Sequence, residues 1–117
     1  MKPIVREEVQ AALNAFTGKA VYLHLETTNG AYAGESAEHQ SMAVCAYVRN
    51  AVVRFHRGVI TGAGPYRAGL QMEQGWIYAE GLTDFEVTPE GRLLLAGHDA
   101  EGRLAVALQL SETPFPL

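Results

Sequence analysis

The residues best suited to chemistry in this sequence are a histidine and a glutamate two positions apart, His24 and Glu26. They lie in a stretch, 19–27, in which apolar residues recur at every second position, as is typical of a β-strand. Two side chains at this spacing leave a strand on the same face, roughly 7 Å apart at about 3.3 Å rise per residue. An imidazole and a carboxylate so placed could bind a divalent metal, or act as a general base and the group that orients it. Either role needs a third group from elsewhere in the chain.

Two further residues are candidates for that third group. Glu80 lies in an aromatic-rich stretch that resembles a strand, and His98 ends another such stretch. If folding brought these strands together, the chain would hold a His, Glu, Glu, His cluster. The competing interpretation is that each residue lies on a solvated strand face or makes one structural hydrogen bond, because polar residues of these types are mostly exposed. We therefore commit to no catalytic residue and no metal ligand: the catalytic candidates are His24, Glu26, Glu80 and His98, and the metal candidates are His24, Glu26 and His98.

A second group of candidates lies in the stretch 62–83, which is rich in aromatic residues and glycine. Flat rings and a guanidinium could stack on and pair with an anionic or sugar-like ligand. Rings at alternate strand positions are equally what the core of a small β protein requires, so both interpretations stay open. The ligand-binding candidates are Arg67, Tyr66, Trp76, Tyr78 and Glu80.

Cys45 is the only cysteine, which excludes an internal disulfide and any zinc site built from several thiolates. Its neighbours are apolar, so we expect a buried, unreactive thiol. The sequence contains no Gly-x-Ser-x-Gly elbow, no Walker phosphate loop and no His-Glu-x-x-His helix. It therefore requires no cofactor, and we lean away from an enzyme.

The composition indicates a soluble globular protein. A chain of 117 residues fits a single domain, 1–117, and no apolar run approaches the about 18 residues that span a bilayer. The net charge of −4 and the scattered basic residues argue against nucleic-acid binding. Glu7 and Glu8 stand where a signal peptide would need its apolar core, so we expect a cytoplasmic protein without membrane contact.

The elements that must position these residues begin with one helix. Residues 3–17 carry apolar side chains at helical spacing, with Pro3 suited to the first turn and Gly18 to the stop. From 19 to 111 the period changes to two, which predicts antiparallel β structure.

Turn signals divide that β region. Asn29-Gly30 is typical of a tight hairpin, Arg49-Asn50 is expected to form another turn, and 34–41 reads as a polar loop. The tail, 112–117, contains two prolines and is expected to be extended. The pattern predicts a mainly-β fold: an antiparallel distorted barrel or sandwich of about seven to nine short strands with one N-terminal α-helix.

A glycine- and aromatic-rich segment, Gly75–Thr83, reads Gly-Trp-Ile-Tyr-Ala-Glu-Gly-Leu-Thr. Together with several shorter segments spread along the chain, it resembles the YojF family of small bacterial proteins. The resemblance implies a mainly-β distorted barrel or sandwich and no defined reaction. It also implies a genomic neighbourhood, because such proteins are often encoded beside a zinc-dependent deacetylase of the kind used in making bacillithiol, a low-molecular-weight thiol. The other segments that carry the resemblance are His24–Thr27, Tyr47–Asn50, Gly64–Arg67, Leu93–His98 and Leu108–Glu112.

Two functions are consistent with these observations. The preferred one is a non-enzymatic binding or accessory module, with the adjacent-gene deacetylase as an expected partner and a symmetric homodimer as one way to cover an exposed sheet edge or face. The alternative is a metal-assisted hydrolase that uses the His/Glu cluster.

Overall fold

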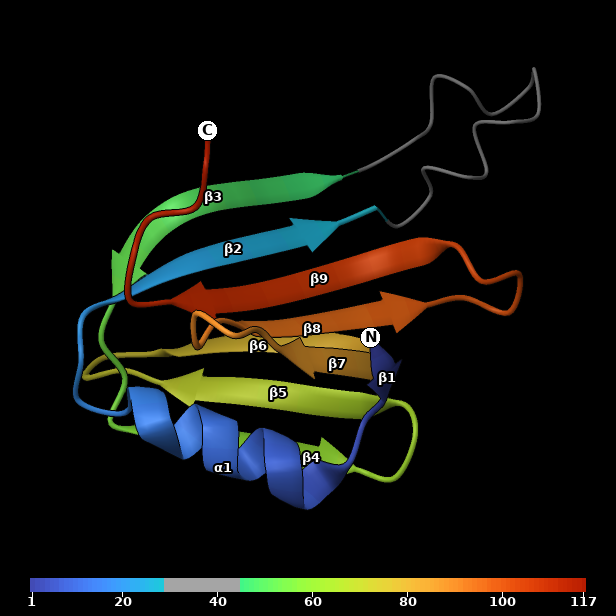
Figure 1. Ribbon diagram of the computed structural model, residues 1–117, viewed down its shortest axis with the longest axis horizontal. Coiled ribbons are helices and arrows are strands. Elements are labelled where there is room, and N and C mark those ends of the chain that lie inside the picture. The colour runs from blue at the N-terminus through green and yellow to red at the C-terminus, as the bar shows by residue number, and fades with distance from the viewer. Residues whose placement is uncertain (29–44) are drawn as a thin grey trace.

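Two antiparallel sheets and one helix make up the fold in the computed structural model, which describes residues 1–28 and 45–117 (Figure 1). The larger sheet has the strand order β1-β7-β8-β9-β2-β3, and the smaller one has the order β4-β5-β6. This confirms the predicted mainly-β class as a distorted sandwich; the strands of the described residues close no barrel. In chain order the elements are β1 (Lys2–Pro3), α1 (Arg6–Phe16), β2 (Val21–Thr27), β3 (Ala46–Val53), β4 (Arg57–Gly62), β5 (Tyr66–Gln71), β6 (Trp76–Leu82), β7 (Asp84–Val87), β8 (Leu93–His98) and β9 (Leu104–Ser111).

The hydrophobic core lies between the two sheets and follows from the alternation along each strand. In the larger sheet, Leu23 of β2 pairs with Leu110 of β9, and Leu110 pairs with Leu93 of β8, so that one row of leucines crosses three strands. These side chains share a buried cluster with Ala68 and Leu70 of the smaller sheet. The next residues along β2 and β9 therefore point away from the core, to the outer face of the larger sheet.

The helix α1 covers the edge of the smaller sheet, where it buries Val9, Leu13 and Phe16. The Gln10 side chain hydrogen-bonds the backbone of the edge strand β4, as a neighbouring strand would. Its Nε2 donates to the Gly58 carbonyl at 2.8 Å, and its Oε1 accepts from the Ile60 N–H at 3.1 Å. An edge strand covered in this way offers fewer free backbone groups to another chain. The part of the chain that the structure describes contains no helix long and apolar enough to cross a bilayer.

The helix is shorter than the predicted 3–17, because the chain first forms a strand. Lys2 pairs with Phe85 and Pro3 with Asp84, as the short edge strand β1. Proline is tolerated there because an edge position does not need its N–H. At the other end Gly18 has φ +77°, which agrees with the predicted stop.

The predicted turn at Arg49-Asn50 is wrong, because both residues lie inside β3. The pairing register of β2 with β3 shifts by one residue between Leu23 and His24, so that Asn50 is the extra residue of a β-bulge. Its φ of 60° lies in the left-handed region, which asparagine tolerates better than most residues. The predicted hairpin at Asn29-Gly30 and the predicted loop at 34–41 lie outside the described residues.

The two sheets lie close together at a glycine of β8. A Cβ atom placed on Gly97 would lie 2.1 Å from the backbone oxygen of Gly81 and 2.6 Å from a methyl group of Val106. Only a residue without a side chain fits between these groups. This contact fixes the end of β6 against β8 and β9.

Candidate functional site

The aromatic candidates gather on the outward side of the smaller sheet. Alternation along β6 places Trp76, Tyr78 and Glu80 on that side, while Ala79 points into the core. The Trp76 and Tyr78 rings stack with their planes 6° apart and their centroids at 5.3 Å, and they keep 36% and 48% of their surface exposed. We call the surface formed by Arg67, Gly69, Trp76, Tyr78 and Glu80 the ring face.

Charge is paired within the ring face. The Arg67 guanidinium lies 5.0 Å from the centroid of the Tyr78 ring and forms an ion pair with Glu80. The two side chains are more than half exposed, so the pair is solvated and adds little stability. Its effect is to hold a cation against the face of an aromatic ring that is open to solvent.

Gly69 makes the stacked arrangement possible. It pairs with Tyr78 across β5 and β6, and a Cβ atom there would lie 3.0 Å from Cε1 of Tyr78 and 3.3 Å from Cζ3 of Trp76. Without a side chain at this position, the rings can lie directly on the backbone of β5. Tyr66 does not share this surface, since it packs against the core cluster from the other side of β5.

His24 and Glu26 do meet, on the outer face of the larger sheet. His24 Nε2 lies 3.2 Å from Glu26 Oε1, which agrees with the expectation that the two side chains project together. Of the two alternatives to a functional role, a solvated strand face or one structural hydrogen bond, His24 agrees with the second, because it is only 5% exposed and pairs with Glu26. The Tyr47 ring stands edge-on to the imidazole at 5.2 Å, and the Phe115 ring of the tail lies at 6.4 Å.

The other nitrogen of that imidazole, His24 Nδ1, is buried and has no hydrogen-bond partner among the described residues. A buried polar atom in this state carries a cost of desolvation. The carboxylate of Glu26 is less enclosed, with 27% of its side chain exposed. The pair therefore has one solvent-facing side, at Glu26, and one covered side, at His24.

The remaining two candidates have other partners. His98 ends β8, where its Nδ1 lies 3.0 Å from Oδ1 of Asp84. The Thr83 hydroxyl donates to the same carboxylate at 2.6 Å, and these two hydrogen bonds hold the pKa of Asp84 below its usual value. Glu80 is bound to Arg67. Within residues 1–28 and 45–117, no three His, Cys, Asp or Glu side chains are grouped so as to hold a metal ion.

The exposure of Cys45 differs from the prediction. The apolar neighbours of Cys45 predict a buried thiol, but Cys45 precedes β3 and is exposed. The apolar residues around it in the sequence include Val48, which is itself 38% exposed. Local composition predicts burial only where a second layer covers the strand.

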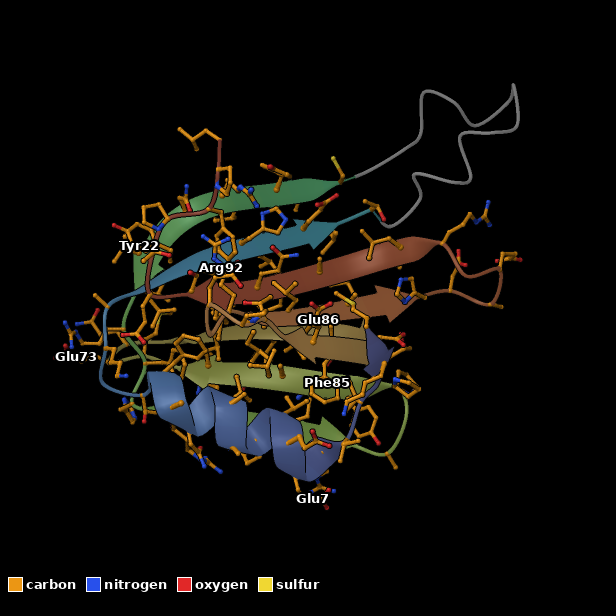
Figure 2. All side chains as sticks on the ribbon, in the orientation of Figure 1. Glu7, Tyr22, Glu73, Phe85, Glu86 and Arg92 are labelled. Atoms are coloured by element: carbon orange, nitrogen blue, oxygen red, sulfur yellow. The ribbon has the colours of Figure 1, made fainter. Side chains whose placement is uncertain are left out.

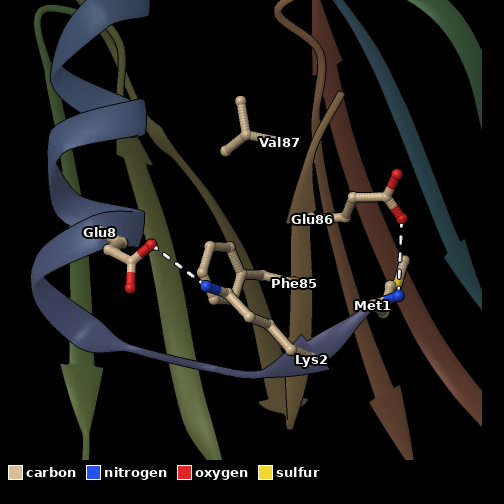
Figure 3. Close-up of a pocket in the computed structure, with 6 residues that line it drawn as sticks. All are labelled: Met1, Lys2, Glu8, Phe85, Glu86 and Val87. Atoms are coloured by element: carbon tan, nitrogen blue, oxygen red, sulfur yellow. Dashed lines mark hydrogen bonds and ion pairs between the residues drawn. The ribbon is translucent and has the colours of Figure 1, made fainter. Parts of the chain in front are cut away.

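A hollow of about 420 Å³ lies beside the N-terminus, between α1 and β7 (Figure 3). Its charged groups are paired with one another. Lys2 Nζ lies 3.4 Å from Glu8 Oε1 and 5.3 Å from the centroid of the Phe85 ring, and the terminal amine of Met1 lies 3.6 Å from Glu86 Oε1. These pairs satisfy the charges of the hollow internally.

The matches to known proteins extend over nearly the whole chain. A family model described as "Protein of unknown function (DUF1806)" matches residues 3–115. "Uncharacterized protein YojF" of Bacillus subtilis (strain 168) is 54% identical over 115 residues, which cover 98% of both proteins. The chain belongs to the YojF family. The YojF resemblance drawn from the sequence is thereby confirmed.

The YojF fold is also known from a crystal structure. The structure of the Bacillus subtilis YojF protein matches with a TM-score of 0.81 at 49% identity, over 99% of this chain and 97% of that one. At this identity and coverage the likeness supports the two-sheet arrangement throughout the described residues.

Proposed function

We propose that this protein is a non-enzymatic accessory module that binds a partner protein through the ring face. The observation that carries the proposal is the exposed stack of Trp76 and Tyr78 with Arg67 against it. Tryptophan, tyrosine and arginine are the residues that most often dominate the binding energy of protein interfaces. Rings stacked on a sheet backbone lose little conformational entropy when a partner covers them.

The partner we propose is a zinc-dependent deacetylase of low-molecular-weight thiol synthesis, encoded by an adjacent gene. The support for this partner is the genomic neighbourhood that the family resemblance implies. The proposal includes a cytoplasmic location for both proteins and makes the deacetylase, not this chain, the source of the chemistry. Arg67 and Glu80 offer one charge of each sign at the rim of the surface, where charged groups set orientation and association rate.

Co-purification tests this proposal. The native protein is expected to retain the deacetylase at micromolar concentrations and to change its rate, and the double substitution Trp76→Ala and Tyr78→Ala is expected to abolish both effects. Val52→Ala provides a matched control, because Val52 is 58% exposed on β3 of the other sheet. Failure of the native protein to associate, together with an unchanged deacetylase rate, would contradict the proposal.

The alternative of a metal-assisted hydrolase is favoured by one observation, the contact of His24 with Glu26. Among the described residues, this contact brings together two groups, whereas a catalytic zinc site uses three protein ligands. Metal analysis of the purified protein distinguishes the two functions: a stoichiometric metal that is lost in His24→Ala supports the hydrolase, and equal metal content in the two proteins counts against it.

A further inference from the structure

The C-terminal tail, 112–117, crosses the outer face of the larger sheet, from the end of β9 past β2 to β3 (Figure 1). Its Phe115 is only 5% exposed, although it lies outside the main core cluster. Its last residue, Leu117, is fully exposed. The Phe115 ring is therefore the buried point of a tail whose last residue is exposed to solvent.

The backbone of this segment is recognised at three successive residues. The Arg92 Nη2 donates to the carbonyl of Pro114 at 3.1 Å, the Asn50 Nδ2 to that of Phe115 at 2.8 Å, and the Arg49 Nη2 to that of Pro116 at 2.7 Å. The Phe115 N–H in turn donates to Asn50 Oδ1 at 2.8 Å. Because proline has no N–H, these bonds satisfy every backbone polar group of 114–116.

The Phe115 side chain is recognised as well. The guanidinium carbons of Arg49 and Arg92 each lie 5.0 Å from the centroid of its ring, and the ring of His24 lies 6.4 Å from it. Cation–π contacts with two arginines favour an aromatic ring over an aliphatic side chain of similar size. We call the group formed by His24, Arg49, Asn50 and Arg92 the tail cradle.

The tail cradle is built into the sheet. Asn50 points at the tail because the bulge in β3 holds it at φ 60°, a conformation that persists in non-glycine residues only where surrounding contacts maintain it. Arg92 reaches the tail from the turn before β8 and is oriented by the Ser111 hydroxyl, which accepts from its Nε at 3.1 Å (Figure 2). Ser111 is itself 1% exposed. The cradle thus uses residues from three separate strands or turns.

We propose that the tail cradle is a peptide-binding site for a proline-flanked phenylalanine, and that the tail of a second copy of this chain binds there in exchange for the chain's own tail. The tail of a second copy fits the cradle, because the identical segment 114–116 of the chain itself satisfies all of its backbone hydrogen bonds there. The connection to β9 runs through Glu112 and Thr113, which are exposed and are held at the surface, Glu112 by an ion pair with Lys19 at 3.6 Å and Thr113 by hydrogen bonds with Ser111 and Arg92. Exchange of the tail therefore breaks solvated contacts, which each add little stability. Exchange of an identical element is a low-cost route to a dimer. The proposal does not depend on the ring face.

The first test adds the tail as a separate molecule. A fluorescent hexapeptide with the sequence of 112–117 is titrated into the full-length Phe115→Ala variant, in which the cradle is intact and its own anchor is absent. We expect saturable binding to this variant. Binding to the native chain should be at least about tenfold weaker, since there the attached tail competes at high effective concentration. A peptide with alanine in place of phenylalanine is the control and is expected not to bind.

The second test asks for exchange between two chains. Phe115→Ala has an intact cradle, and Asn50→Gly has an intact tail. When the two variants are mixed, the tail of Asn50→Gly is expected to bind the cradle of Phe115→Ala, which gives a one-to-one complex in native mass spectrometry. Each variant alone is expected to stay monomeric. Circular dichroism establishes that each variant is folded, and Phe115→Leu replaces Phe115→Ala if the latter unfolds. Absence of peptide binding to a folded anchor variant, or equal binding of the control peptide, would overturn the peptide site. Peptide binding without a complex in the mixture would overturn the second copy as occupant.

Discussion

Asn50 and Phe115, 65 positions apart in the chain, are joined by two reciprocal hydrogen bonds of 2.8 Å between the side-chain amide of one and the backbone of the other. This pair fastens the tail to β3 and thereby covers His24. It also gives a reason for the left-handed backbone at the bulge, because that conformation directs the amide toward the tail.

Two substitutions of Asn50 distinguish the contribution of its amide to stability from that of its backbone conformation. Asn50→Gly removes both hydrogen bonds but suits a positive φ, so we expect a loss of about 1–3 kcal/mol in the free energy of unfolding. Asn50→Ala removes the same bonds but keeps a Cβ at the left-handed position, so we expect it to be roughly 1–2 kcal/mol less stable than the glycine variant. Urea unfolding measures both values; an alanine variant as stable as the glycine variant would contradict the assigned strain.

Removal of the Phe115 ring is expected to expose His24. Phe115→Ala deletes a buried ring at the surface of the fold, where the tail can move away, so we expect a loss of about 2–3 kcal/mol, at or below the low end of the range for core phenylalanines. The rate at which diethyl pyrocarbonate modifies His24, followed by mass spectrometry, should rise severalfold. Leu117→Ala is the matched control, since Leu117 is already exposed. An unchanged rate in Phe115→Ala would show that the tail does not cover the imidazole.

The close approach of the two sheets predicts a strong effect of one added methyl group. Gly97→Ala places a Cβ on the backbone oxygen of Gly81, and because backbone cannot rotate away, we expect a loss of about 3 kcal/mol or more. Gly75→Ala is the control, since a Cβ there meets no atom within 4 Å. Thermal unfolding of the two variants measures the difference, and equal melting temperatures would refute the close contact.

The hydrogen bonds of Asp84 predict a pH dependence. Its pKa is lowered in the folded state by the Thr83 hydroxyl and by His98, so the unfolded chain binds more protons in the acidic range and stability falls as the pH drops. This contribution is present above the usual pKa of aspartate and is lost as the pH falls through the lowered value. Asp84→Asn removes it. The variant should therefore lose less stability than the native chain between about pH 5 and about pH 3. Parallel loss in the two proteins would count against this assignment.

The fold was largely predictable because its signals are local. The period of two in β2 and β9 reports which side chains face the core, and Leu23, Leu108 and Leu110 are buried as that pattern requires. The short strand β1 was not predictable, because Lys2 and Pro3 acquire it only by pairing with β7, more than 80 positions away. Asparagine at position 50 predicts a turn because this residue tolerates a left-handed backbone, and Asn50 does have that backbone, but the sheet continues through it as a bulge.

The candidate sites were predictable in part. Alternation correctly grouped Trp76, Tyr78 and Glu80, and it grouped His24 with Glu26. Alternation could not show that the tail would bury His24, because the contact with Phe115 is long-range and leaves no pattern in the sequence of β2. Arg49, Asn50 and Arg92 were missed as a group for the same reason: their common partner is a segment at the other end of the chain. The proline-flanked phenylalanine was the one available signal, since a buried ring in a tail needs a place to bind.

Calorimetric titration of the adjacent-gene deacetylase is the most direct measurement of the binding proposed for the ring face. We expect saturable one-to-one heat with the native chain and with Val52→Ala, and a loss of at least about 2 kcal/mol in binding free energy for Trp76→Ala, as is typical of a dominant interface tryptophan. Circular dichroism should show that Trp76→Ala remains folded, because the ring is exposed. Equal affinity of Trp76→Ala and the native chain, or no heat with either, would contradict partner binding through the ring face.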